Sequence, residues 1–444
     1  MKASKYNFFY PYKNNNNKII AYNSRSNVLS LMEKASFEKY KNFINKSIEI
    51  DDENLVKDLV KGQYLIDDNI DELNILKYNF LRSCYSTKGL GLTIAPTLDC
   101  NFACIYCYEK KGRKNLDMSV DVQDKVIEFV KDNIPTINSL HIMWYGGEPL
   151  LAFNSIKYMS EKIIDLCDKN DIKYTAGMVT NGYNLNKTVA KELAALRINF
   201  LQVTIDGIKE IHDQRRPLAG GQGTFDKIIE NLLESYSEVE RISLRINIDK
   251  KNASQLDDLL IELEKKDLPQ KIAVYLGLVE GTNNCYDEDL CVSMQEFSGL
   301  SYNFEKTLIK NDGYDILIGY PTLRGNVCSA DTLNGFVIDP KGLLYKCWSD
   351  IGIEDMAVGS LVINKDFRPN ANLLYKYMLF DPTSDGECKN CNMLPLCMGG
   401  CPKRRLDNNP NRCTKYKYNL EEYLQWVVEN LKKDDKLGDT ISSI

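Results

Sequence analysis

The sequence predicts an α/β protein. Its central part is expected to be a partial barrel of six βα units, with a small N-terminal α+β region before it and a cysteine-rich region after it. Three observations support this. From Leu92 onward, strand and helix patterns alternate with a repeat of roughly thirty residues, which is typical of a parallel sheet. Three cysteines lie within residues 100–107, and seven more lie between Cys328 and Cys413.

The first 88 residues differ from the rest of the chain in their pattern of apolar and polar residues. Two short apolar runs flank a polar run of four asparagines, which predicts a hairpin. Helical patterns follow, and a short apolar run ahead of two aspartates predicts a wing strand. A helical extension that only caps the barrel is the alternative. The predicted elements are strands at 8–10, 19–22 and 64–66 and helices at 29–43 and 53–60.

The barrel region contains six predicted strands with helical segments between them. In the segment 119–134, Ser119 can cap a helix on which Val126, Ile127 and Val130 share one face. In parallel βα barrels the chemistry collects at the carboxyl ends of the strands, so candidate site residues are sought there. The predicted strands are 92–97, 139–145, 173–180, 200–205, 243–248 and 272–278.

The three cysteines after the first strand are Cys100, Cys104 and Cys107. A zinc site normally has a fourth ligand nearby, and none follows; a structural zinc knuckle is the alternative. Three thiolates on a four-iron cluster leave one iron open to a small molecule. The CxxxCxxC spacing, with the aromatic Tyr106 before the last cysteine, resembles the radical S-adenosylmethionine (SAM) superfamily.

This resemblance implies a SAM site at the strand ends. Gly146, Gly147 and Glu148 follow the second strand; the glycines permit close approach of a ligand and the carboxylate suits an ammonium group, although a tight turn is the alternative. Thr204 belongs to a Thr-x-Asp-Gly turn, and Arg216 corresponds to an arginine that contacts the SAM carboxylate. His212, nearby, is expected to be structural. The implied SAM contacts are Tyr106, Gly146, Gly147, Glu148, Asn181, Thr204, Arg216 and Leu278.

The C-terminal cysteines, spaced C-x2-C-x5-C-x3-C from Cys388, resemble the SPASM extension of peptide- and sulfatase-maturing enzymes. The resemblance implies two auxiliary [4Fe-4S] clusters besides the SAM-binding one. The outer cluster would take Cys388, Cys391, Cys397 and Cys413, and the inner one Cys328, Cys347 and Cys401. The inner cluster is then one ligand short. A substrate thiolate is one completion; Asp331, a loop residue, water, or one of Cys84, Cys167, Cys285 and Cys291 is the other.

Trp348 follows Cys347 where sulfatase-maturing relatives have an aspartate that accepts a proton, and the nearest acid is Asp350. We therefore expect a different peptide modification. The resemblance implies that a 5′-deoxyadenosyl radical modifies a ribosomally synthesised precursor peptide, with a thioether crosslink between a cysteine sulfur and a carbon as the first hypothesis. A carbon–carbon or carbon–oxygen crosslink, formylglycine formation and a non-enzymatic electron-transfer role are the alternatives.

Composition limits the partners. The net charge is −6, which argues against a nucleic-acid partner, and no apolar run reaches the length of a membrane span. The first residues lack an apolar signal segment, so we expect a cytoplasmic protein. The resemblance to the radical SAM superfamily implies flavodoxin or ferredoxin as the reductant. The N-terminal order of elements resembles small peptide-recognition domains that bind a leader. The predicted domains are 1–88 (peptide recognition), 89–312 (barrel), 313–416 (SPASM) and 417–444 (closing helix and tail).

Overall fold

The computed structural model describes residues 1–112, 115–310, 320–321, 323, 328–363, 365–431 and 441–443. The chain forms two compact units. We call residues 84–293 with 328–380 the barrel unit, and residues 1–83, 294–327 and 381–444 the terminal unit. The predicted domain bounds remain predictions, and the bound at 312/313 and most of the tail after residue 431 lie outside the described residues.

The barrel unit is built on a sheet with the strand order β11-β10-β9-β8-β7-β6-β12-β13-β14. The strands β6 to β11 pair in parallel and correspond to the six predicted strands. Beyond β6, the described part of the sheet continues with the parallel strand β12 and the antiparallel β13 and β14. The bounds are β6 (Gly89–Ile94), β7 (Ser139–Trp144), β8 (Lys173–Thr180), β9 (Ile198–Thr204), β10 (Arg241–Ile248), β11 (Ala273–Leu278), β12 (Gly335–Ile338), β13 (Leu343–Tyr345) and β14 (Gly359–Ser360).

The first barrel strand is displaced from its predicted position. β6 begins at Gly89 and ends at Ile94, so the prediction of 92–97 was shifted toward the C-terminus. Pro96 has no N–H to continue the ladder, and the chain there turns toward another partner, because the Met118 N–H donates to the Pro96 carbonyl at 2.8 Å. The start of β6 was missed because its glycines interrupt the apolar pattern by which a strand is predicted.

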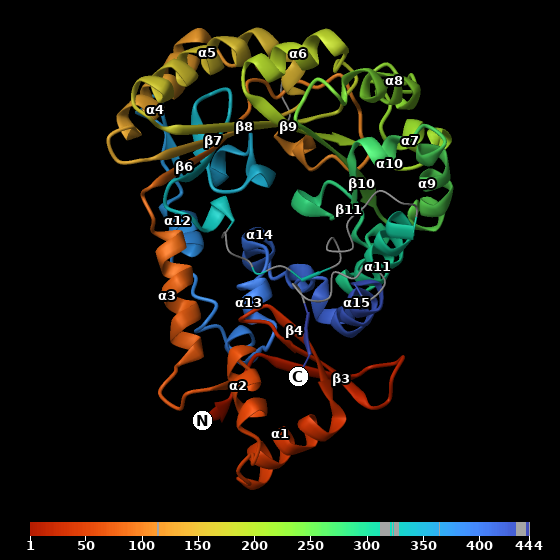
Figure 1. Ribbon diagram of the computed structural model, residues 1–444. Helices are drawn as coiled ribbons and strands as arrows, with labels where there is room; N and C mark the ends of the chain where they lie inside the picture. Colours follow the sequence, from red (N-terminus) through yellow and green to blue (C-terminus); the bar gives the residue numbers. More distant parts are fainter. Residues whose placement is uncertain are drawn as a thin grey trace. The chain divides into compact units, whose positions relative to one another are not determined.

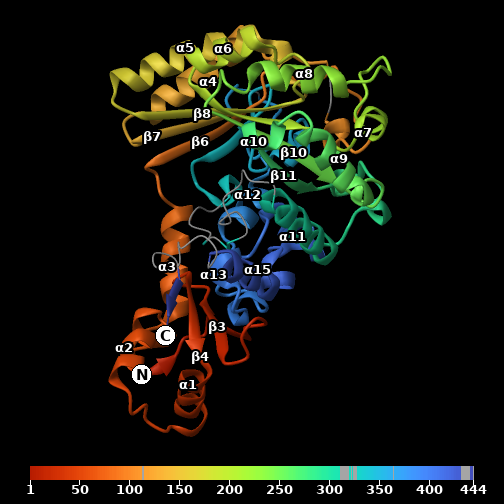
Figure 2. The same ribbon diagram turned by 45° about the vertical axis from the view of Figure 1, so that its right-hand side comes forward.

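Helices cover one face of the parallel strands, as Figures 1 and 2 show for α4, α5 and α6. The predicted cap of α4 is confirmed, since the Ser119 hydroxyl accepts a hydrogen bond from the Val122 N–H at 3.4 Å. Val126 and Val130 of this helix are fully buried. The helices of the unit are α4 (Val120–Asn133), α5 (Phe153–Lys169), α6 (Lys187–Ala195), α7 (Lys209–Arg215), α8 (Phe225–Ser235), α9 (Leu256–Glu264), α10 (Leu268–Lys271) and α12 (Ala371–Met378).

The terminal unit contains a sheet of order β15-β4-β3-β2 and a short pair, β1 with β5. The predicted hairpin and the wing strand are confirmed as β2–β3 and β5. The bounds are β1 (Lys2–Ala3), β2 (Asn7–Pro11), β3 (Lys18–Asn23), β4 (Val28–Glu33), β5 (Leu65–Ile66), β15 (Ile441–Ser443), α1 (Lys34–Lys46), α2 (Glu53–Lys61), α3 (Glu72–Cys84), α11 (Met294–Lys310), α13 (Leu394–Cys397), α14 (Pro402–Leu406) and α15 (Tyr416–Leu431).

The predicted helix at 29–43 was wrong at its start, because residues 28–33 form β4 and the helix begins at Lys34. Leu29 and Leu31 join one hydrophobic cluster, and Met32 joins the cluster on the opposite face. A strand buried on both faces shows no polar alternation, so it cannot be told from a buried helix by its pattern.

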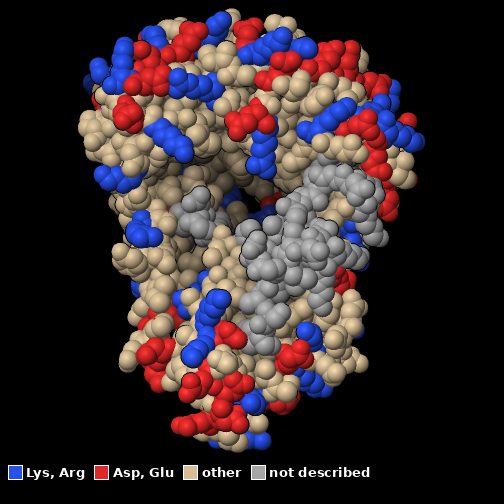
Figure 3. All heavy atoms as spheres, viewed as in Figure 1, with Lys and Arg blue, Asp and Glu red and all other residues tan. Residues whose placement is uncertain are grey.

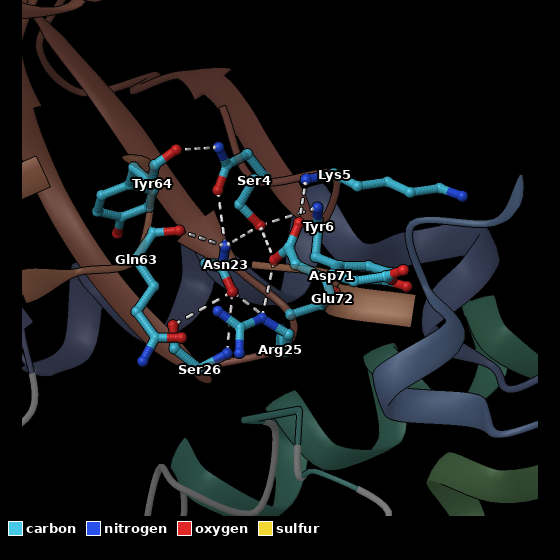
Figure 4. Close-up of polar contacts among 12 residues, drawn as sticks. Ser4, Lys5, Tyr6, Asn23, Arg25, Ser26, Gln63, Tyr64, Asp71 and Glu72 are labelled. Carbon is cyan, nitrogen blue, oxygen red and sulfur yellow. Dashed lines mark hydrogen bonds and ion pairs between the residues drawn. The ribbon is translucent and has the colours of Figure 1, made fainter. Parts of the chain in front are cut away.

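A buried polar network joins β1, β3 and α3 (Figure 4). The Asn23 amide donates to the Ser4 hydroxyl at 2.9 Å, and that hydroxyl donates to Glu72 at 2.6 Å. Glu72 also accepts from the Arg25 Nε at 2.8 Å and from the Lys5 N–H at 2.8 Å. Because these buried groups are mutually paired, the network fixes the N-terminal segment against α3.

The helix α15 is the predicted closing helix, and its Leu420, Tyr423, Leu424, Val427 and Val428 lie in one hydrophobic core with residues of β3 and β4. None of the described helices is both long and apolar enough to cross a bilayer. On the face seen in Figure 3, basic and acidic side chains are intermixed.

Candidate functional site

The cysteine loop follows β6, and Cys100, Cys104 and Cys107 are all partly buried on it. Burial, with Glu109 and Cys104 nearby, raises the pKa of the Cys107 thiol to about 12. In the described part of the chain no three His, Cys, Asp or Glu side chains converge closely enough to hold a single metal ion. The donor set itself, three soft thiols on one short loop, fits a [4Fe-4S] cluster with one open iron.

The backbone of the loop is held by the segment that follows α7. The Ala103 N–H donates to the Pro217 carbonyl at 2.9 Å, and the Ile105 N–H donates to the Arg215 carbonyl at 3.0 Å. Residues more than one hundred positions downstream therefore set the path of the chain between the three cysteines.

Gly146 and Gly147 pack against the residues that lead into the cysteine loop. Gly146 has φ +112°, and a Cβ there would lie 2.4 Å from the Thr97 carbonyl oxygen. A Cβ on Gly147 would lie only 2.0 Å from the Asp99 carbonyl oxygen. The sequence suggested that these glycines admit a ligand; the structure adds that they admit the backbone ahead of Cys100.

Glu148 is fully buried at the carboxyl end of β7. Its Oε1 accepts from the Thr180 hydroxyl at 2.7 Å and from the Leu150 N–H at 3.0 Å, and its Oε2 accepts from the Asn181 N–H at 2.7 Å. Burial raises the pKa of this carboxyl group. A carboxylate has about four acceptor positions, so these three bonds leave capacity for an ammonium donor.

Tyr106 connects the cysteine loop to the residue after α7 and to β10. Its hydroxyl oxygen accepts from Arg216 Nη1 at 2.7 Å and from Asn247 Nδ2 at 3.0 Å. The Arg216 guanidinium also lies over the Phe102 ring, 5.7 Å from its centroid, and its buried Nε has no hydrogen-bond partner. An incompletely paired buried guanidinium is suited to receive a carboxylate.

The remaining predicted SAM contacts also lie at strand ends. Asn181 follows β8, and its amide donates to the Asn101 side chain of the cysteine loop at 2.7 Å. Thr204 is the buried last residue of β9, and Leu278 is the partly buried last residue of β11. The structure thus brings all the predicted SAM contacts to the carboxyl edge of one sheet, where the cysteine loop also lies.

One group that supports the site was missed in the sequence. Arg215 is buried between Asp206 and Asp249, at 3.3 and 2.7 Å, and Asp249 also accepts from the Tyr286 hydroxyl at 2.7 Å. The run of charged residues at 212–216 is visible in the sequence. The sequence does not reveal that the partner of Arg215 lies on the loop after β10. Because the Arg215 carbonyl also binds Ile105, this ion pair helps to fix the cysteine loop.

His212 is structural, as expected. Its Nδ1 accepts from the Asp206 N–H at 3.2 Å, and its Nε2 lies 3.0 Å from the Thr224 hydroxyl. Burial lowers the pKa of His212 well below its ordinary value, so the ring is neutral.

Trp348 lies beside the barrel site. Its ring stacks on Tyr145, with the centroids 5.2 Å apart and the planes at 15°, and 42% of the side chain is exposed. The Tyr145 hydroxyl meets that of Tyr108, directly after Cys107. Asp350 is buried and accepts from the Tyr377 hydroxyl at 3.5 Å. The stacked Trp348 thus occupies the position at which the sulfatase-maturing pattern has an acid.

The C-terminal cysteines are divided between the units: Cys328 and Cys347 belong to the barrel unit, and Cys388, Cys391, Cys397, Cys401 and Cys413 to the terminal unit. In the terminal unit the Cys401 N–H donates to the Arg412 carbonyl at 3.3 Å. Gly400 has φ +77°, and a Cβ there would lie 1.8 Å from the same oxygen. The glycine therefore lets the Cys401 segment pack against the segment of Cys413.

The alternative ligands considered for the inner cluster lie in different settings. Cys84 and Asp331 are both buried, and the Leu333 N–H donates to the Cys84 carbonyl at 2.7 Å. Cys167 is fully buried within α5. Cys285 donates to the Tyr108 carbonyl at 3.4 Å, and Cys291 donates to the Asp287 carbonyl at 3.6 Å.

Several known proteins are similar to this chain in sequence. Residues 94–260 match the model of the radical SAM superfamily. The chain is 25% identical to a cysteine-type anaerobic sulfatase-maturating enzyme of Clostridium novyi over 80% of this chain and 99% of the relative. It is 24% identical to the mycofactocin maturase MftC of Mycolicibacterium smegmatis over 70% of this chain and 77% of the relative.

Two solved structures share the fold. The structure of anSMEcpe with bound AdoMet and Cp18Cys peptide aligns with a TM-score of 0.58 and 20% identity, covering 78% of this chain and 99% of that one. Streptococcus suis SuiB bound to precursor peptide SuiA aligns with a TM-score of 0.52 and 15% identity, covering 93% and 98%. The match over residues 94–260, with the cysteine loop and the Gly-Gly-Glu turn at neighbouring strand ends, shows that this enzyme contains a radical SAM domain.

Proposed function

We propose that this enzyme modifies a ribosomally synthesised precursor peptide by forming intramolecular thioether crosslinks from a cysteine sulfur to a carbon. Family membership implies SAM and one [4Fe-4S] cluster as cofactors. When bound, they supply the 5′-deoxyadenosyl radical that removes hydrogen from an unactivated carbon. The proposed ligands of the SAM-binding cluster are Cys100, Cys104 and Cys107.

The protein's own residues would orient SAM at the strand ends. Glu148 is proposed to accept from the SAM ammonium, and Arg216 to donate to its carboxylate. Thr204 and Asn181 are proposed to complete the polar contacts. Tyr106 holds Arg216 in place through a hydrogen bond of 2.7 Å, which supports its assignment to this site. Leu278, the last residue of β11, is proposed to pack against the adenine. Gly146 and Gly147, which follow β7, are proposed to let SAM approach the backbone.

A peptide substrate is supported by the relatives. A sulfatase-maturating enzyme and a mycofactocin maturase are similar to this chain in sequence, and two solved structures of the same fold hold peptides. The elements at the N-terminus would then bind the leader of the peptide. The thiol-rich chain is assigned to the reducing cytoplasm, with flavodoxin or ferredoxin as reductant.

Two auxiliary [4Fe-4S] clusters are proposed as the acceptor of the surplus electron when the thioether forms. In the terminal unit, the Lys417 ammonium group donates to the Cys413 Sγ at 3.5 Å. The proposed outer set is Cys388, Cys391, Cys397 and Cys413, and the proposed inner set is Cys328, Cys347 and Cys401. The inner set lacks a fourth cysteine and leaves a position for a substrate thiolate.

The observation that carries the choice of reaction is the replacement of an acid by Trp348, stacked on Tyr145. Formylglycine formation needs a proton acceptor at that position, and the nearest acid, Asp350, is buried against Tyr377. Formylglycine formation stays the second candidate because the similarity to a sulfatase-maturating enzyme extends over 80% of the chain.

The test is anaerobic incubation of the reconstituted enzyme, dithionite and SAM with the small cysteine-containing peptide encoded beside the gene, followed by mass spectrometry. Thioether formation removes two hydrogen atoms per site and protects one cysteine from alkylation. The same mass loss with every thiol still alkylated indicates a carbon–carbon or carbon–oxygen bond. An aldehyde that reacts with a hydrazide indicates formylglycine. An unmodified peptide contradicts all three.

A further inference from the structure

One cation on the inner face of the barrel has no role in the site described above. Along β10, Leu244 and Ile246 are fully buried on the helix-covered face, whereas Arg245 and Asn247 alternate with them and are partly buried on the opposite face. Asn247 donates to the Tyr106 hydroxyl at 3.0 Å, so this opposite face is the one that meets the cysteine loop.

The strand register places Arg245 within the candidate SAM site. It pairs with Thr204 of β9 on one side and with Tyr275 of β11 on the other. Paired residues of parallel strands project from the same face of the sheet, so these three side chains form a row across the inner face. Thr204 is the last residue of its strand, and the row therefore lies at the edge where barrel enzymes carry out their chemistry.

The side chains that adjoin the positively charged Arg245 guanidinium are neutral. Its Nε donates to the Asn247 side chain at 2.7 Å, and its partners in the strand register, Thr204 and Tyr275, are uncharged side chains. None of the ion pairs formed among the described residues includes Arg245, whereas Arg215, the last residue of α7, is paired with two carboxylates. A guanidinium has five donors in a fork that matches a carboxylate. Arg245 is thus equipped for an anion that the described residues do not supply.

The neighbouring strand is adapted to this side chain. Gly277 of β11 pairs with Asn247, and a Cβ on it would lie 2.2 Å from Arg245 Nε and 2.7 Å from its Cζ. The guanidinium therefore lies across a position that has no side chain, and any other residue at 277 would displace it. The orientation of Arg245 depends on this glycine.

We propose that Arg245 binds a carboxylate of the peptide substrate and thereby selects peptides with an acidic residue near the modified position. This rests on the proposed function, since it takes the substrate to be a peptide. The SAM carboxylate has the same chemistry, but Arg216, with an unpartnered buried Nε beside the cysteine loop, is already assigned to it. The carboxylate at Arg245 is then a second one.

The test compares Arg245→Gln with Arg241→Gln. Arg241 is a matched control because it is the exposed first residue of the same strand, with its guanidinium over Phe200. The probe is the fluorescently labelled peptide encoded beside the gene, together with versions in which each Asp or Glu is replaced by its amide. Affinities are measured by anisotropy with the reconstituted protein, and SAM affinity is measured separately by equilibrium dialysis.

We expect Arg245→Gln to weaken peptide binding by about 10- to 100-fold, the effect of losing a hydrogen bond to a charged group, while Arg241→Gln leaves it unchanged. One amide-substituted peptide should bind wild type and Arg245→Gln equally. Gly277→Ala, which keeps the arginine but displaces it, should weaken binding in the same direction. Melting temperatures close to that of wild type show that the variants are folded.

Two results would overturn the assignment. Wild-type affinity of Arg245→Gln for every peptide would show that Arg245 has no such contact. Loss of SAM affinity with peptide affinity unchanged would assign Arg245 to the cofactor instead. Failure of the proposed function has a different signature, because the wild-type enzyme would then cleave SAM but neither bind nor modify the peptide, and both proposals would fall together.

Discussion

Replacing Glu148 by Gln perturbs a carboxylate that accepts three hydrogen bonds. The Gln oxygen can keep the bonds from Thr180 and Leu150, but its NH2 group would face the Asn181 N–H, now 2.7 Å from Oε2. Leaving a buried donor unsatisfied costs about 1–3 kcal/mol of unfolding free energy. The variant also loses the charge proposed to hold the SAM ammonium, about 1.5–3 kcal/mol, which weakens SAM binding by about 10- to 150-fold.

The assay is equilibrium dialysis of SAM against anaerobically reconstituted wild type, Glu148→Gln and the control Glu161→Gln, an exposed residue of α5. Burial raises the pKa of Glu148, so this carboxylate takes up a proton at a higher pH than an exposed glutamate does. SAM affinity of the wild type should therefore fall as the pH is lowered toward that raised pKa, while Glu148→Gln shows no such dependence.

Stability should follow the opposite trend. A carboxyl group whose pKa is raised by folding contributes stability at low pH, and this contribution is lost as the pH rises through the raised pKa. The Gln variant lacks this dependence. A SAM dissociation constant equal to that of wild type, with no difference in pH profile, would refute the reasoning and leave Glu148 a purely structural residue.

Two further substitutions test the support of the cysteine loop. Gly147→Ala would place a Cβ 2.0 Å from the Asp99 carbonyl oxygen and should lower the iron content after reconstitution, whereas Gly91→Ala, with no atom within 4 Å, should not; equal iron contents would contradict the account. Asp249→Asn removes the 2.7 Å ion pair of the buried Arg215 and should lower the unfolding free energy in urea by about 3 kcal/mol, and a loss below about 1 kcal/mol would contradict it.

Periodicity predicted most of the barrel because parallel strands alternate with helices on a regular repeat. β8 has the predicted bounds, and β7, β9, β10 and β11 differ from theirs by at most two residues at either end. The errors occurred where periodicity carries no information. β6 starts with glycines, and β4 is buried on both faces, so neither strand shows a strand pattern.

The sequence indicated individual residues of the candidate site but not the contacts between them. The sequence shows Arg215 in a charged run, but it cannot show that Asp249 faces it, because that contact depends on how the loops after β9 and β10 meet. The same holds for the stack of Trp348 on Tyr145, two residues that are distant in the chain. Arg245 and Asn247 did leave a signal, because with Arg241 and Ser243 they are polar residues that alternate with the apolar residues of the strand.

The most direct test of the account is the release of 5′-deoxyadenosine when the anaerobically reconstituted protein is mixed with dithionite and SAM. We predict release by the wild type and by Cys167→Ala, which changes a cysteine buried within α5. Cys107→Ala should abolish it, because one of three thiolates of the cysteine loop is lost. No release from the wild type, or undiminished release from Cys107→Ala, would contradict the central claim that this loop holds the cluster at which SAM is cleaved.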